Sequence, residues 1–224
     1  MKACVIIPAR FKSSRFPGKP LAKILNKEMI LWVAELSAAA VGKPHVYIAT
    51  DDLRISSRVN EYGFNSIITS HNLLTGTDRV AMASKNLNYD IFVNVQGDEP
   101  MVNPNDILKS IEFKKKFPES IINSYSYLNF EENPFNKNIP KVITNELDDL
   151  IYISRAIIPK SKSDEFRKIR YKKQVCIYSY SADELQSFLD FGRKSIIEEI
   201  EDIEILRFFE LNKKIKMFQT TSKS

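Results

Sequence analysis

Short apolar runs alternate with helical stretches along the first half of the chain. The runs are rich in Val and Ile, as expected of strands buried inside a sheet, and they cover residues 2–7, 45–49, 65–69 and 90–95. The stretches between and after them predict helices over residues 28–40, 52–62, 75–86 and 104–117. Because strands and helices alternate with connections of a few residues, the pattern predicts an α/β fold with a mostly parallel sheet covered by helices.

The second half of the chain is less regular and richer in predicted strands. Longer strands are expected over residues 121–128 and 174–180, and two shorter ones within residues 141–153. Helices are expected over residues 183–191 and 196–211. We therefore predict a single domain spanning residues 1–224, in which residues 118–180 form a smaller β-rich lobe.

Composition narrows the class of protein. Hydrophobic residues make up 43% of the 224 residues and charged residues 27%, as is typical of a globular domain. The net charge of +5 is spread along the chain among acids, so it does not indicate nucleic-acid binding. Cys4 and Cys176 are isolated and lack metal-site spacing, which favours reduced thiols. Without a signal peptide or an apolar run near the roughly 20 residues of a membrane helix, the sequence predicts a soluble cytoplasmic protein with no membrane insertion.

The loop after the first strand concentrates positive charge. Residues 8–20 contain four cations, two hydroxyl groups, three prolines and one glycine. Pro8 is expected to end the strand, and Pro17 and Gly18 to fix a turn. A solvated basic loop is the simplest interpretation. The position at the carboxyl end of a predicted parallel strand favours instead a site for a polyanion such as a triphosphate.

Three further loops follow predicted strands, over residues 50–52, before residues 75–79, and over residues 96–100. In a parallel sheet these ends share one edge, so the four loops are expected to converge. Asp98 follows a strand and a glycine, and a carboxylate there suits Mg²⁺, which takes one or two carboxylates together with substrate phosphates. The alternative for Asp98 is a turn former. No glycine fingerprint follows the first strand, which argues against a dinucleotide site.

Four motifs carry a family resemblance. They are Pro-Ala-Arg-x-x-Ser-x-Arg-x-Pro-Gly-Lys-Pro at 8–20, Ala-Thr-Asp at 49–51, Thr-Gly-Thr-Asp-Arg-Val-Ala at 75–81 and Val-Asn-Val-Gln-Gly-Asp-Glu-Pro at 93–100. In order and spacing the chain resembles the sugar-acid cytidylyltransferases, most closely the 3-deoxy-manno-octulosonate (Kdo) cytidylyltransferase family. The segments 154–159 and 198–207 resemble that family as well, so the likeness runs from residue 6 to about residue 211.

The resemblance implies a Rossmann-like fold of the nucleotide-diphospho-sugar transferase type. It also implies a reaction, the Mg²⁺-dependent transfer of CMP from CTP to the anomeric hydroxyl of a 2-keto-3-deoxy sugar acid, with release of pyrophosphate. Kdo is the first choice of acceptor, and the product would serve lipopolysaccharide or capsule synthesis. By the same analogy we expect a homodimer formed through the smaller lobe.

The resemblance also implies site residues. The nucleotide would be bound by Ala9, Arg10, Ser14, Arg15, Lys19, Thr77, Arg79 and Gln96. The catalytic residues would be Lys19, Arg10 and Asp98, with Asp98 as the metal ligand. The acceptor would be bound by Gln96, Arg155, Gln174, Tyr178, Glu201 and Glu204. The alternatives are a surface ion pair for Arg155 and solvated helix positions for the two glutamates.

Three departures from the family pattern leave the acceptor open, one of which is that residues 133–142 keep only part of that pattern. The family continues into a Val-Asp-Thr-like segment that supplies a second metal-binding Asp, and this sequence ends at Ser224 near that point. The family also has a His on the strand where Gln174 stands here. The alternatives are therefore another acid, namely an amino-Kdo, a different nonulosonic acid or a phosphonate, or a non-catalytic CTP-binding paralogue.

Overall fold

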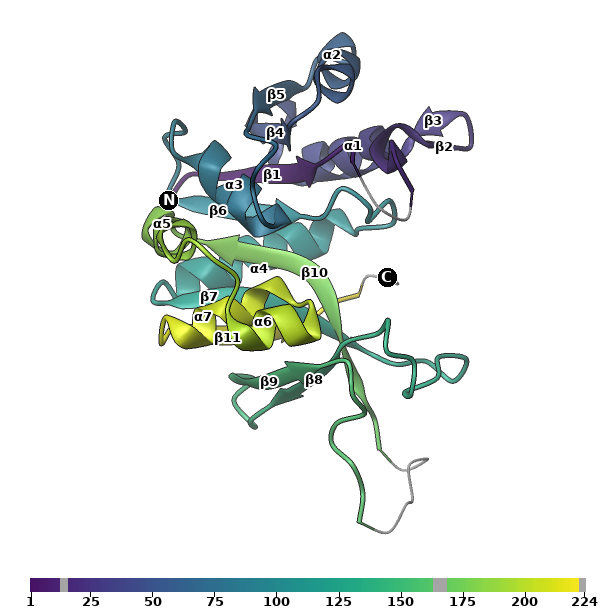
Figure 1. Ribbon diagram of the computed structural model, residues 1–224, viewed down its shortest axis with the longest axis vertical. Coiled ribbons are helices and arrows are strands. Elements are labelled where there is room, and N and C mark those ends of the chain that lie inside the picture. The colour runs from purple at the N-terminus through teal and green to yellow at the C-terminus, as the bar shows by residue number, and fades with distance from the viewer. Residues whose placement is uncertain (13–15, 163–168, 222–224) are drawn as a thin grey trace.

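The computed structural model describes residues 1–12, 16–162 and 169–221, which form a central sheet with helices on both sides (Figure 1). The strands are β1 (Ala3–Ala9), β2 (Lys23–Ile24), β3 (Lys27–Glu28), β4 (Val46–Thr50), β5 (Asn65–Ile68), β6 (Ile91–Val95), β7 (Ser120–Tyr127), β8 (Lys141–Thr144), β9 (Leu150–Ser154), β10 (Lys172–Tyr180) and β11 (Lys214–Gln219). The α-helices are α1 (Met29–Val41), α2 (Leu53–Glu61), α3 (Gly76–Ser84), α4 (Pro104–Lys116), α5 (Ala182–Asp190), α6 (Ile196–Glu201) and α7 (Arg207–Glu210). Short 3₁₀ turns are η1 (Lys19–Leu21), η2 (Lys43–His45) and η4 (Glu204–Leu206).

The main sheet has the strand order β11-β7-β10-β6-β1-β4-β5. Strand β1 runs parallel to both β4 and β6, and β4 runs parallel to β5. Strand β10 is antiparallel to its neighbours β6 and β7. The carboxyl ends of β1, β4, β5 and β6 therefore lie at one edge, which confirms the predicted convergence of the loops that follow them. The α/β class with a mostly parallel sheet is confirmed as well.

Both faces of the sheet are covered, which explains why its central strands are apolar throughout. Val5 and Ile7 of β1 face a core that includes α1, α2 and α4, whereas Cys4 and Ile6 face a core that includes α3, α5 and α7. An alternating polar face would leave buried polar groups on a strand of this kind. No helix in the described part of the chain is long and apolar enough to cross a membrane.

Strands β8 and β9 branch from the main sheet. Strand β8 pairs antiparallel with the first residues of β10 and with β9, and the branch projects beyond the other strands in Figure 1. The turn between them contains Asp148, whose φ is 59°, so the two predicted strands and their turn are confirmed. Strands β7 and β10 of the predicted lobe at 118–180 are also part of the main sheet. The limits of a separate lobe stay a prediction.

The predicted helix over residues 196–211 is wrong in its middle. Helix α6 ends at Glu201 because Asp202 takes the left-handed conformation, with φ 50° and ψ 49°. The chain then continues as η4 and α7, with Ile205 fully inside the core. The apolar spacing stays helical through the break, so the sequence pattern gave no sign of it. Strand β11, parallel to β7, was not predicted.

Pro8 does not end the first strand, contrary to expectation. Strand β1 continues to Ala9 and pairs with β4 as far as that residue. Its pairing with β6 ends at Ile6. A proline at position 8 therefore interrupts no hydrogen bond on the β6 side, which makes it compatible with a central strand.

Candidate active site

A cavity of about 600 Å³ opens at the edge where the parallel strands end. Among the predicted site residues, its wall contains Ala9, Arg10, Lys19, Arg79, Gln96, Asp98 and Glu204. Ser14 and Arg15 lie outside the described residues. The structure thus brings most of the described nucleotide set together, from three loops that are far apart in the sequence.

The first loop is shaped by a tight turn at Gly18. Its φ is 73°, a conformation that favours glycine, and its N–H donates to the Phe11 carbonyl oxygen at 2.9 Å. The turn puts Lys19 at the start of η1, and the Lys19 ammonium donates to Asp98 Oδ2 at 2.6 Å. The cation-rich loop and the acid-bearing loop therefore meet at the cavity wall.

The end of β6 approaches β1 closely at Gly97. A Cβ at this position would lie 2.8 Å from the Pro8 carbonyl oxygen, so only glycine fits without a shift of backbone. This close approach sets Gln96 and Asp98, on either side of Gly97, beside the first loop. Steric crowding by the Pro8 backbone therefore explains why a glycine stands between Gln96 and Asp98.

The N-terminus of α3 is occupied by a carboxylate from the same chain. Glu204 accepts hydrogen bonds from the Gly76 N–H at 3.0 Å, the Thr77 N–H at 2.7 Å and the Thr77 hydroxyl at 2.6 Å. Backbone N–H groups and the helix dipole favour an anion at this place. Glu204, predicted to bind acceptor hydroxyls, lines the cavity with both oxygens already bonded. Thr77 is bonded to Glu204 and is not among the lining residues.

A buried arginine links the helices that contribute to this wall. Arg207 is fully buried and donates to both oxygens of Glu198 at 2.7 Å and to Asp78 Oδ1 at 2.8 Å. Asp78 in turn accepts from the hydroxyl of Thr75, the N-cap of α3, at 2.6 Å. The network ties α3, α6 and α7 together. Sequence reasoning did not single out Arg207 or Asp78. The sequence feature that could have pointed to Arg207 is its place among the mostly apolar residues 203–208.

Arg79 is almost completely buried in the cavity wall. Its guanidinium donates to Asp51 Oδ2 at 3.2 Å and to the hydroxyl of Thr69. Burial lowers the pKa of Arg79, and Asp51 opposes that effect. Asp51 belongs to the Ala-Thr-Asp motif, so this motif holds a cation of the site in position.

Two of the predicted acceptor residues hold the protein together instead of lining the cavity. The Arg155 guanidinium donates to the backbone carbonyl oxygens of Lys137, Glu201 and Asp202. The Glu201 carboxylate accepts from the Ser154 hydroxyl at 2.6 Å and from the Arg155 N–H at 2.8 Å. These contacts fix the end of β9 to the C-terminus of α6.

Gln174 and Tyr178 lie together on β10 and are not among the lining residues of the cavity. Gln174 Nε2 donates to Tyr178 Oη at 3.2 Å and to Asn123 Oδ1 at 3.1 Å. Tyr178 is 7% exposed, and burial raises the pKa of its hydroxyl. Tyr178 is paired in register with Asn94 of β6, two residues before Gln96, so β10 holds this pair beside the strand that ends in the cavity wall.

Several lining residues were not predicted. They include the apolar residues Phe16, Leu73 and Leu74 and the charged residues Lys194, Glu198 and Asp202. Leu73 and Leu74 precede the Thr-Gly-Thr motif directly, so their place was deducible from the strand-end rule. Lys194 and Asp202 flank α6, and their proximity to the first loop depends on long-range packing that no local pattern reveals.

The acid pair Asp98 and Glu99 differs in environment. The Asp98 side chain is 49% exposed, whereas burial, together with the charge of Asp98, raises the pKa of Glu99 to about 7. No cluster of three or more His, Cys, Asp or Glu that could hold a metal ion occurs among the described residues. An exposed carboxylate beside Lys19 nevertheless fits Mg²⁺, which takes much of its coordination from substrate phosphates and water.

Known proteins resemble this chain over nearly its full length. The family model described as cytidylyltransferase matches residues 4–215. The 3-deoxy-manno-octulosonate cytidylyltransferase of Escherichia coli is 34% identical over 221 residues, 99% of this chain and 89% of that protein. The 8-amino-3,8-dideoxy-manno-octulosonate cytidylyltransferase of Shewanella loihica is 36% identical, covering 97% of this chain and 89% of the relative. The solved structure of CMP:2-keto-3-deoxy-manno-octonic acid synthetase complexed with CTP has a TM-score of 0.91 at 34% identity, covering 100% of this chain and 92% of that chain.

Proposed function

Since the chain belongs to the cytidylyltransferase family and is a nucleotidyltransferase, we propose that it transfers CMP from CTP to the anomeric hydroxyl of a 2-keto-3-deoxy sugar acid. The relatives whose names specify Kdo or its 8-amino analogue support an acceptor of this type. The observation that carries the proposal is the meeting of Lys19 and Asp98 in one cavity wall, at 2.6 Å. It sets a cation suited to phosphate beside a carboxylate suited to Mg²⁺.

The reaction is a displacement at phosphorus. The anomeric oxygen of the acceptor forms a bond to the α-phosphorus, the bond from that phosphorus to the bridging oxygen breaks, and pyrophosphate leaves. The hydroxyl proton passes to solvent. Such transfers depend on positioning and on neutralising phosphate charge. Arg10 and Lys19 would bind the triphosphate, and Lys19 would stabilise the charge that develops on pyrophosphate. Arg79, held by Asp51, would add positive potential on the opposite side of the nucleotide.

Asp98 would hold Mg²⁺, which when bound neutralises phosphate charge and polarises the phosphate under attack. Gln96, next to Gly97 in the same wall, would contact the acceptor or the nucleotide through its amide. Glu204 would keep α3 in place through Gly76 and Thr77. In accord with the family resemblance, we also expect a cytoplasmic homodimer whose product feeds lipopolysaccharide or capsule synthesis.

The proposal is tested by identifying the product. The protein is incubated with CTP and Mg²⁺ together with Kdo, 8-amino-Kdo, a nine-carbon 2-keto acid or a phosphonate, and ³¹P NMR and mass spectrometry follow the mixtures. A CMP-linked sugar acid with one pyrophosphate per product is the expected result. CTP binding without any CMP adduct across the panel would refute transferase activity toward these acids. A CMP adduct of the phosphonate alone would move the acceptor to another class.

A further inference from the structure

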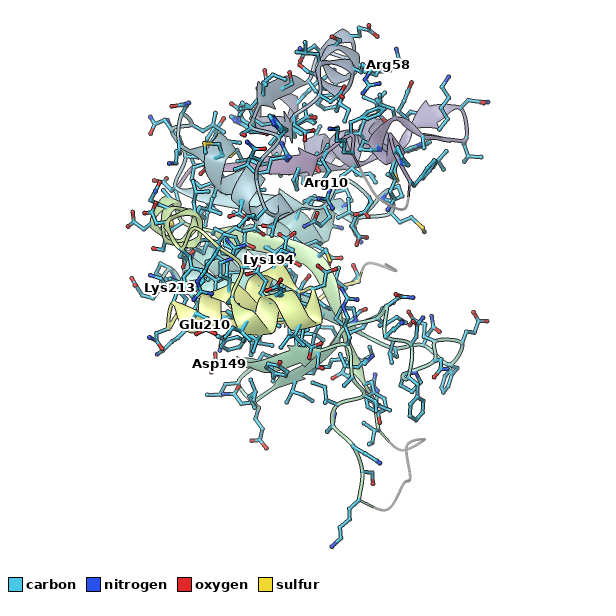
Figure 2. The ribbon with its side chains drawn as sticks, in the orientation of Figure 1. Arg10, Arg58, Asp149, Lys194, Glu210 and Lys213 are labelled. Carbon is cyan, nitrogen blue, oxygen red and sulfur yellow. The ribbon has the colours of Figure 1, made fainter. Side chains whose placement is uncertain are left out.

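The cavity wall contains cations from separate parts of the chain. Arg10 and Lys19 follow β1, whereas Lys194 comes from the turn between α5 and α6. Figure 2 labels Arg10 and Lys194 and shows that they belong to different elements. Lys194 belongs, with Glu198, Asp202 and Glu204, to the charged side chains that the late segment contributes to the wall. A second anion could therefore be bound by a cation that does not belong to the first loop.

Lys194 is held loosely. Its ammonium lies 3.8 Å from Asp202 Oδ1, and the Asp202 side chain is 74% exposed. A pair with this separation and this exposure contributes little free energy, so a ligand can replace Asp202 at small cost. By contrast, Glu198 is committed to Arg207 and Glu204 to the N-terminus of α3. Lys194 is thus the readily available cation that the late segment contributes to the wall among the described residues.

Arg155, one of the residues predicted to bind the acceptor, is bonded to other parts of the protein. Arg155 donates from all three guanidinium nitrogens to backbone carbonyl oxygens, and it is not among the lining residues of the cavity. Releasing its guanidinium would leave carbonyl oxygens at the end of α6 without their partner. The carboxylate of an acceptor needs a cation that can be released more cheaply than Arg155.

We propose that Lys194 binds the carboxylate of the sugar-acid acceptor and so positions its anomeric hydroxyl for attack. The inference rests on the proposed function. A 2-keto acid carries its carboxylate on the anomeric carbon, so fixing the carboxylate also fixes the nucleophilic oxygen. Two anionic substrates in one cavity repel each other unless separate cations bind them, and Lys194 lines the cavity from a different part of the chain than Arg10 and Lys19. An ammonium group suits a single carboxylate as a compact point charge.

The test compares Lys194→Gln, Lys194→Arg and the control Lys85→Gln. Lys85 is exposed at the C-terminal end of α3 and carries the same charge outside the described cavity wall. We expect the KM for Kdo to rise about tenfold or more in Lys194→Gln, as for a lost hydrogen bond to a charged group, with the KM for CTP within about twofold of wild type. Lys194→Arg should restore most of the affinity, and Lys85→Gln should behave as wild type.

A second measurement isolates the carboxylate. Kdo and its methyl ester are titrated by calorimetry into protein saturated with CTP in metal-free buffer. Wild type should prefer the acid, and Lys194→Gln should lose that preference, an outcome that a merely structural role would not produce. An increased KM for CTP with an unchanged KM for Kdo would overturn the proposal, as would an unchanged preference for the acid. Absence of turnover in wild type would count against the proposed function instead, and the titration would still decide the role of Lys194.

Discussion

The ammonium of Lys19 lies 2.6 Å from Oδ2 of Asp98, although the two residues are 79 positions apart in the sequence. Their side chains are 42% and 49% exposed, so solvent screens the pair and its net stabilisation is at most about 1 kcal/mol. A triphosphate can therefore take Lys19, and a divalent cation can take Asp98, at little cost. The triphosphate, by binding Lys19, would free Asp98 for the divalent cation, and the cation, by binding Asp98, would free Lys19 for the triphosphate.

The first prediction concerns CTP binding without metal. Asp98→Asn removes the carboxylate that holds Lys19 and that repels the triphosphate, so we expect CTP to bind more tightly in buffer with EDTA, by several-fold. With Mg²⁺ and acceptor the same variant should lose turnover while its free energy of unfolding stays close to wild type. Calorimetric titration and a turnover assay check the two parts.

The control for this variant is Asp90→Asn, because Asp90 is exposed at the opposite end of the same strand, β6. It removes an equal charge outside the described cavity wall and should leave CTP affinity unchanged. Equal or weaker metal-free binding in Asp98→Asn would show that the ion pair does not compete with the triphosphate.

A second prediction concerns the buried network below α3. Arg207→Met leaves Asp78 and Glu198 without their cation, and breaking such a buried pair costs roughly 3–5 kcal/mol of the free energy of unfolding. Urea unfolding followed by circular dichroism measures the loss. Arg193→Met is the control, since Arg193 is exposed two residues before the buried Ser195 and donates to a local carbonyl oxygen. A loss below about 1 kcal/mol in Arg207→Met would contradict the assigned role.

A third prediction separates two glycines of the site. Gly97→Ala puts a Cβ 2.8 Å from the Pro8 carbonyl oxygen, so β1 and the β6 loop must move apart. We expect a loss of roughly 1–3 kcal/mol in the free energy of unfolding, with lower activity. At Gly76 the nearest neighbour of an added Cβ is 3.4 Å away, an ordinary contact, so Gly76→Ala should be the milder change. Thermal unfolding of both variants tests the order, and the reverse order would be inconsistent with the close approach at Gly97.

A fourth prediction follows from the Glu99 carboxyl, whose pKa is raised from 4.5 to about 7, mainly by burial. Between these values the folded protein binds the proton more tightly than the unfolded chain, so the free energy of unfolding falls as pH rises from about 4.5 to about 7. Glu99→Gln removes this slope. At pH 8 the variant should be more stable than wild type by roughly 1–3 kcal/mol, and near pH 4.5 the two should match.

Chemical denaturation of both proteins between pH 4.5 and pH 8 provides the measurement for Glu99. The exposed Glu131 supplies the matched control, since Glu131→Gln should keep the wild-type slope. If Glu99→Gln kept that slope as well, the carboxyl would not be the group that titrates in this range.

The strand-end rule explains how much of the site could be predicted from sequence. Gln96 and Asp98 come at the end of an apolar run and Lys19 lies in the loop after another, and parallel pairing of β1 with β6 brings these two loops together. The same rule placed Arg79 near Asp51 through β4 and β5. These residues could be found because their positions depend on strand order alone.

The acceptor side could not be predicted in the same way. The break at Asp202 lets Glu204 reach α3 and lets Arg155 bind the end of α6, yet the helical spacing of apolar residues continues through it. Whether an arginine faces a cavity or a carbonyl oxygen depends on such long-range geometry. Lys194 reaches the wall from the turn before α6, which again depends on long-range packing.

Pyrophosphate release tests the central claim most directly. The assay uses CTP, Mg²⁺ and wild-type protein, with and without Kdo or 8-amino-Kdo, beside Lys19→Ala and the exposed control Lys23→Ala. We predict release that requires a sugar acid, falls about 10²- to 10³-fold in Lys19→Ala, as for the loss of one charge-stabilising donor, and is unchanged in Lys23→Ala. Bound CTP without release in the presence of either acid, or full activity in Lys19→Ala, would contradict the account.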